Sequence, residues 1–186
     1  MLLIAVEDAA GRWDVVKDLQ SRAESAVAAN IATPCSSNVS SLLLCALANV
    51  HLGNEKEARR LERSVEDLGM EGYGNVFDPR YIEIAIARGD LAEVERKLSE
   101  WSPEGFLDFD GLIARLNALV ALERRAEIEE EAPALVKPGT YLEPFALRAL
   151  GYARGDDGPI QQAIERFEAM GLDWHAAQTR NLMSSA

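Results

Sequence analysis

A short turn recurs along this chain and constrains its fold more than any other feature of the sequence. The turn reads His51-Leu-Gly-Asn54, Ala87-Arg-Gly-Asp90 and Ala153-Arg-Gly-Asp156, and each copy lies between two segments with apolar residues at helical spacing. Its glycines are separated by 36 residues and then by 66 residues, close to one and two units of a helix-turn-helix repeat of roughly 34 residues. A fixed period of this kind predicts an all-α array of stacked helix pairs, an α-solenoid.

The apolar pattern predicts about five helix pairs followed by a terminal helix, and no strand. Residues 42–48 are apolar on every side, which is typical of a helix packed between neighbours. The fourth pair is the weakest, because its turn reads Glu123-Arg-Arg without glycine. The expected pairs are 2–9 with 13–29, a helix ending near 52 with 55–68, 81–87 with 91–101, 112–122 with 124–135, and 142–153 with 160–170, and the terminal helix takes 173–183.

The bulk composition fits one repeat domain over residues 1–186 and disfavours several classes of partner. An apolar content of 48% in 186 residues is enough for a continuous core. The formal net charge of −12 repels nucleic acid and anionic membranes. The apolar opening, residues 1–6, has no basic flank and ends at Glu7, so it predicts neither a secretory signal nor a membrane span. We therefore expect a cytoplasmic protein with no nucleic-acid or membrane partner.

No catalytic, cofactor or metal signature stands out, and we predict that the chain is not an enzyme. It lacks Gly-x-Ser-x-Gly, and its only histidines are His51 and His175, for which packing is the favoured role. Two cysteines form no metal-ligand cluster, and the apolar surroundings of Cys45 should raise its thiol pKa. The glutamates at 127 and 129–131 fit a solvated helix face better than general bases. The alternative is a helical scaffold, enzyme or small-ligand sensor, that encloses a pocket with converging titratable groups.

The recurring turns resemble those of the tetratricopeptide repeat. Gly53-Asn54 followed by Ala58 matches the turn and the alanine of the second helix, and Ala46 occupies the small position seven residues before the glycine. Residues 163–182 are also similar to the closing segment of the helical-repeat regions of large bacterial ATP-dependent regulators, including LuxR-type activators and proteins coupled to adenylate cyclase domains. Those families carry a phosphate-binding loop, and this chain has no Gly-x-x-x-x-Gly-Lys-Ser/Thr. ATP hydrolysis and promoter binding therefore do not carry over.

The resemblance implies a right-handed solenoid that binds a protein or peptide, as a regulatory or assembly module in signalling or transcription regulation. It places a binding groove along the first helix of each pair, just before the turn. By their offset from the glycine, the residues expected there are His51, Glu83, Arg148 and Tyr152, with Asn117 inferred from the weak fourth pair. The alternative is that these are ordinary surface or inter-repeat positions. The opening residues 1–6, apolar around the helix, are expected to dock onto a preceding domain of a longer parent protein, which is the favoured explanation, or onto a second copy.

Overall fold

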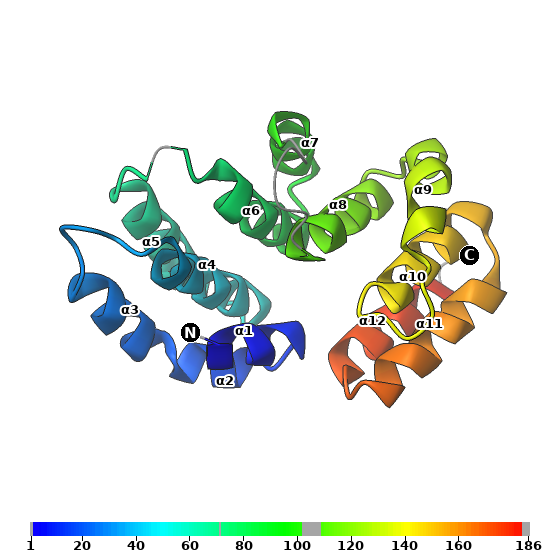
Figure 1. Ribbon diagram of the computed structural model, residues 1–186, viewed down its shortest axis with the longest axis horizontal. Coiled ribbons are helices and arrows are strands. Elements are labelled where there is room, and N and C mark those ends of the chain that lie inside the picture. Colours follow the sequence, from blue (N-terminus) through cyan, green and yellow to red (C-terminus); the bar gives the residue numbers. More distant parts are fainter. Residues whose placement is uncertain (1, 71, 102–108, 184–186) are drawn as a thin grey trace. The chain divides into compact units, whose positions relative to one another are not determined.

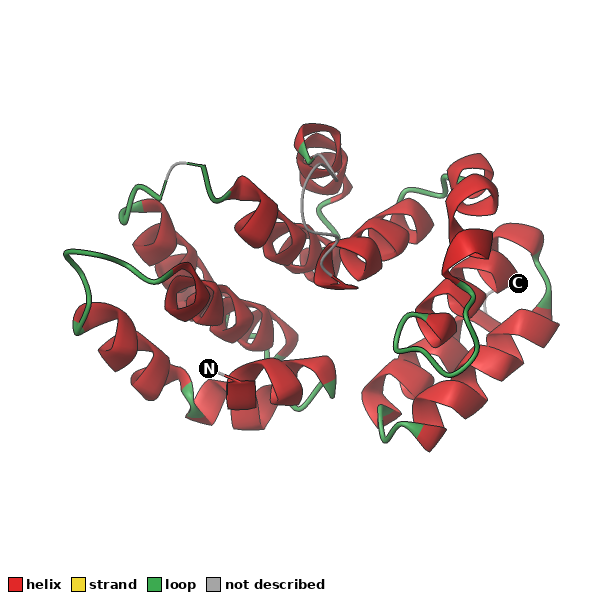
Figure 2. Cartoon of the chain, in the orientation of Figure 1, coloured by secondary structure: helices red, strands yellow, loops and turns green. Residues whose placement is uncertain are grey.

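The computed structural model describes residues 2–70, 72–101 and 109–183, and every regular element within these ranges is a helix (Figure 1, Figure 2). The expected all-α class is therefore confirmed. The chain divides into two compact units, residues 1–103 and residues 104–186. Each is described by itself below, and the single domain expected over residues 1–186 stays a prediction.

Unit 1 is arranged around one central helix, α4. Helix α4 forms a hairpin with α5 and also packs against α2, α3 and α6, while α6 forms a hairpin with α7. Ten of the sixteen residues of α4 are buried, as its all-apolar run predicted. The helices of this unit are α1 (Leu2–Ala9), α2 (Trp13–Asp18), α3 (Gln20–Ala28), α4 (Ser36–His51), α5 (Glu55–Glu66), α6 (Gly74–Arg88) and α7 (Leu91–Glu100).

Unit 2 is arranged around α10 in the same way. Helix α10 forms a hairpin with α11 and packs against α8, α9 and the short helix η1, and α12 packs on α11. The elements are α8 (Phe109–Ala121), α9 (Arg125–Glu131), the 3₁₀ helix η1 (Ala132–Leu135), α10 (Glu143–Arg154), α11 (Asp157–Ala169) and α12 (Asp173–Met183).

The same backbone turn closes α4, α6, α8 and α10. Gly53, Gly89 and Gly155 have φ of 74°, 71° and 61°, and Glu123 takes this place with φ of 56°, the one non-glycine residue at positive φ in the described ranges. In each turn the next amide donates to a carbonyl five residues earlier, as in Asp90 to Ala85 (3.0 Å). The turns are thus 36, 34 and 32 residues apart. Glu123 thus forms the turn predicted for the weak fourth pair and divides the 66-residue interval between Gly89 and Gly155 into two repeats.

The two Ala-Arg-Gly-Asp turns each join neighbouring hairpins as well as reversing the chain. Asp90 caps α7 by accepting the Glu93 amide (3.1 Å). Arg88 reaches back to the preceding hairpin, where its Nη1 donates to Glu62 of α5 at 2.9 Å as part of a two-point pair.

Unit 2 repeats this arrangement. Asp156 caps α11 by accepting the Gly158 amide (2.9 Å). Arg154 makes two bonds of 2.8 Å to Glu129 of α9. The arginine of this motif therefore ties one helix pair to the pair before it.

Several predicted helix bounds are wrong for identifiable reasons. The helix expected at 13–29 is divided at Leu19, whose amide is shared between the carbonyls of Val15 (3.2 Å) and Val16 (3.1 Å), so that α2 and α3 can both follow the surface of α4. The helix expected at 124–135 ends as α9 at 131 and continues as η1, because Pro133 has no amide to donate. Helix α6 begins at 74 rather than 81. The additional residues include Phe77, which is buried in the core of unit 1.

Candidate functional site

Three of the five residues expected in a binding groove lie together in unit 2. Asn117 is on α8, and Arg148 and Tyr152 are one turn apart on α10, which packs against α8. All three are half-buried. Arg148 Nη2 donates a short hydrogen bond to Asn117 Oδ1. The three residues thus lie on the first helices of two successive hairpins.

A fourth residue joins this row, and the sequence reasoning missed it. The guanidinium carbon of Arg125, the first residue of α9, lies 5.5 Å from the ring centre of Tyr152. Its only sequence signal is its position directly after the glycine-free turn Glu123-Arg124. We call Asn117, Arg125, Arg148 and Tyr152 the arginine row.

An aromatic cluster packs against Arg148 of the arginine row. The guanidinium carbon of Arg148 lies 5.4 Å from the ring centre of Phe145 and 5.6 Å from that of Phe167. Both phenylalanines are at most 1% exposed, and their rings meet edge to face with centroids 4.9 Å apart. The ring of His175 on α12 completes the cluster at 5.1 Å from Phe145 and 5.3 Å from Phe167. These contacts give His175 the packing role expected for it.

A close crossing of α10 and α11 places Phe167 next to Arg148. A Cβ atom added to Gly151 on α10 would lie 2.4 Å from Ile160 Cγ1 and 2.9 Å from the carbonyl oxygen of Asp156. Only glycine therefore fits at this crossing of α10 and α11 without a shift of backbone or side chain. The hairpin that carries the row depends on this small residue.

The other two predicted groove residues lie in unit 1, on the neighbouring helices α4 and α6. The ring of His51 stacks on Trp13 with centroids 4.3 Å apart and planes 16° apart. Desolvation by its surroundings lowers the pKa of His51 below its usual value, although part of the side chain stays exposed to solvent. Glu83 is half-buried on α6. One turn before Glu83, Arg80 pairs with buried Asp8 of α1 at 3.5 Å.

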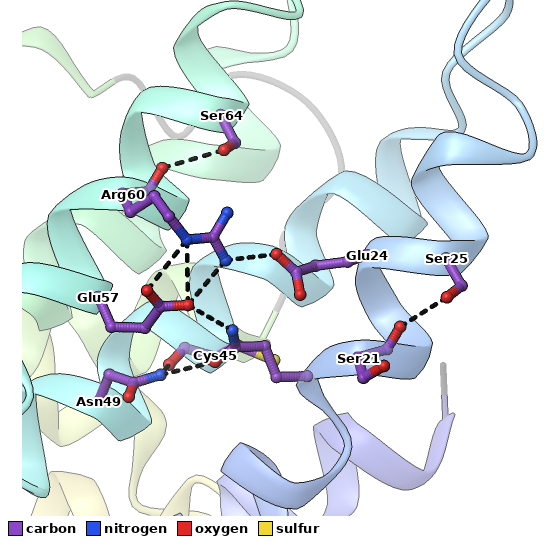
Figure 3. A network of polar contacts seen from close by, with 9 residues as sticks. Ser21, Glu24, Ser25, Cys45, Asn49, Glu57, Arg60 and Ser64 are labelled. Carbon is purple, nitrogen blue, oxygen red and sulfur yellow. Dashed lines mark hydrogen bonds and ion pairs between the residues drawn. The ribbon is translucent and has the colours of Figure 1, made fainter.

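A polar network joins α3, α4 and α5 in unit 1 (Figure 3). Buried Asn49 donates from Nδ2 to Gln20 Oε1 (2.9 Å) and to the Cys45 carbonyl (2.8 Å). Gln20 donates in turn to Glu57 (2.6 Å), and Arg60 bridges Glu57 (2.7 Å) and Glu24. Every one of these contacts is within the helical packing of unit 1. The network therefore ties these three helices to one another.

The surroundings of Cys45 favour a packing role over a catalytic one. Burial, followed by the charges of Glu24 and Asp8, raises the thiol pKa of Cys45 to about 12, so the nucleophilic thiolate is disfavoured.

The acidic run of α9 is largely paired with arginines. Arg115 binds Glu131, Arg124 lies 3.3 Å from Glu127, and Arg154 binds Glu129. The hydrogen bond from Arg154 lowers the pKa of Glu129 below its usual value. These pairs link α8, α9 and α10 at the helix surface.

Within the described residues, no group of three or more histidine, cysteine, aspartate or glutamate side chains could hold a metal ion. No helix in these same ranges is long and apolar enough to cross a membrane. Comparison with protein-family models, curated proteins and solved structures found no significant match. The site must therefore be interpreted from its own geometry.

Proposed function

We propose that this chain is a protein- or peptide-binding scaffold of the tetratricopeptide type, acting as a regulatory or assembly module. In this proposal the helical hairpins continue as a right-handed solenoid, and the first helices of the pairs line the binding surface. The observation that carries the proposal is the arginine row. Asn117, Arg148 and Tyr152 are half-buried on α8 and α10, Arg125 on α9 is exposed, and an aromatic cluster holds Arg148 in place.

The chemistry of the row suits recognition of an extended chain. A half-buried tyrosine offers an aromatic surface and a hydroxyl, and arginine offers several donors in a fixed plane, which is why both are frequent at binding hot spots. Asn117 adds an amide beside Arg148 that can bond to a peptide backbone. A ligand lying along α8 and α10 could contact all of these side chains at once.

Selection of binders from a library of short random peptides, with the whole chain as target, tests this function. We expect binders whose affinity falls about tenfold or more in Tyr152→Ala, as for the truncation of a hot-spot residue. The control is Gln161→Ala on the exposed surface of α11, which should bind as the parent does. Circular dichroism should show that both variants are folded. A library that yields no binder, or binders indifferent to Tyr152, would contradict the proposal.

We also propose that α1 docks onto a preceding domain or a second copy of the chain. Leu3 and Val6, one turn apart on α1, are 50% and 55% exposed. The Leu3→Glu, Val6→Glu double variant should abolish concentration-dependent association and leave the helical content intact. Light scattering coupled to gel filtration measures this. A parent chain that stays monomeric at high concentration would remove this docking role.

A further inference from the structure

We infer that the arginine row recognises the carboxylates of an acidic peptide segment. The inference rests on the proposed peptide-binding function and adds the chemical class of its ligand. Its starting point is Arg125, which sits over the Tyr152 ring and contacts no carboxylate among the residues that the structure describes.

The other arginines near the row are used differently. Arg115 binds Glu131, and Arg154 makes a two-point pair with Glu129. These pairs consume guanidinium donors inside the chain and also neutralise the acidic face of α9. Glu127, two residues after Arg125, lies 3.3 Å from Arg124 instead.

The contact with Tyr152 prepares Arg125 for an anion. A guanidinium over a ring keeps its N–H groups in the plane of the group, pointing away from the ring, where a carboxylate can accept two of them. The ring also restricts the side chain before binding, so less conformational freedom is lost in the complex. Arg125 is held in this way by Tyr152, whereas Arg148, which contacts Phe145 and Phe167, already donates to Asn117.

The charge of the whole chain does not oppose such a contact strongly. The net charge of −12 slows the approach of an acidic ligand, but salt screens interactions beyond about 8 Å at physiological ionic strength. A bound carboxylate therefore responds mainly to the nearby guanidinium groups. We expect an acidic ligand with a modest association rate, selected at short range.

Peptide selection against matched variants tests the ligand class. The same random library, applied to the full chain, should yield peptides enriched in aspartate and glutamate. With Arg125→Gln as target this enrichment should disappear. Arg22→Gln is the control, because Arg22 is exposed on α3 in unit 1 and its loss changes the net charge equally. Selection on Arg22→Gln should keep the acidic enrichment.

Binding of one selected peptide gives the quantitative result. Replacement of its acidic residues by their amides should weaken binding about tenfold, and Arg125→Gln should weaken binding of the acidic form by a similar factor. Selected peptides that are neutral or basic, or acidic peptides that bind Arg125→Gln as well as the parent, would overturn the inference. If those peptides still depend on Tyr152, the proposed function stands without it. A library that yields no binder would overturn both.

Discussion

The central helices of the two units, α4 and α10, are buried by different means. Helix α4 buries an unbroken apolar run, from Leu42 to Ala48, followed by Asn49, whose side-chain amide donates into a hydrogen-bonded network. Helix α10 buries nine of its twelve residues, among them an aromatic ring at Phe145, a bare glycine at Gly151 and a carboxylate at Glu143. The same position in a helical stack can therefore be filled by uniform aliphatic packing or by a mixture of special contacts.

This difference has consequences for substitution. Aliphatic side chains of similar volume can replace one another with modest cost, because such packing needs only volume and an apolar surface. Edge-to-face rings and a glycine crossing depend on individual shapes. We expect α10 to tolerate fewer substitutions than α4, and the following experiments test that expectation.

The largest effect is expected for Phe145→Ala in α10. The side chain is 1% exposed and contacts the rings of Phe167 and His175, so its loss should reduce the free energy of unfolding by about 3 to 5 kcal/mol. Urea denaturation followed by circular dichroism measures the change. Phe109→Ala, at a ring that is 58% exposed, is the matched control and should be nearly silent. Equal midpoints for the two variants would refute the aromatic core.

Leu47→Ala tests the aliphatic core of α4. Leu47 is 5% exposed, and its truncation should cost about 2 to 4 kcal/mol through lost burial and the cavity left behind. Leu47→Met should cost less than about 1.5 kcal/mol, because the volume is nearly kept. A Leu47→Ala chain with an unchanged urea midpoint would mean that this part of α4 is solvent-exposed.

Gly151→Ala tests whether the crossing of α10 and α11 needs glycine. Alanine in a helix interior normally stabilises by about 0.5 to 1 kcal/mol relative to glycine. Here the new methyl group would meet Ile160 and the Asp156 carbonyl, and we expect a net loss of about 1 to 3 kcal/mol. The sign of the change in melting temperature distinguishes the two cases. A higher melting temperature would mean that the helices can separate at no cost.

The smallest effects are expected at the turns, and they should have opposite signs. Gly89→Ala places a Cβ at φ of 71° and should destabilise by about 1 kcal/mol. Glu123→Gly relieves the same conformation at φ of 56° and should stabilise by a few tenths to about 1 kcal/mol. Differential scanning calorimetry of both variants gives the comparison. Shifts of the same sign would show that the two turns are not equivalent.

The sequence by itself determined the local features of this protein. The helix pairs, the burial of α4 and the turns at Gly53, Gly89 and Gly155 follow from apolar spacing and from the left-handed conformation that glycine adopts readily, both of which are properties of short segments. The offset from Gly155 singled out Arg148 and Tyr152, and the weak fourth pair suggested Asn117, which accepts a hydrogen bond from Arg148 in the structure.

Only the tertiary structure decided which side chains meet across the helices. Three of these contacts join residues far apart in the chain: Arg88 with Glu62, Arg125 with Tyr152, and Arg148 with Phe167. The turn at Glu123 was predicted, but its left-handed conformation was not, because non-glycine residues adopt that conformation rarely. Such contacts depend on distances between packed helices, which no local pattern of residues contains.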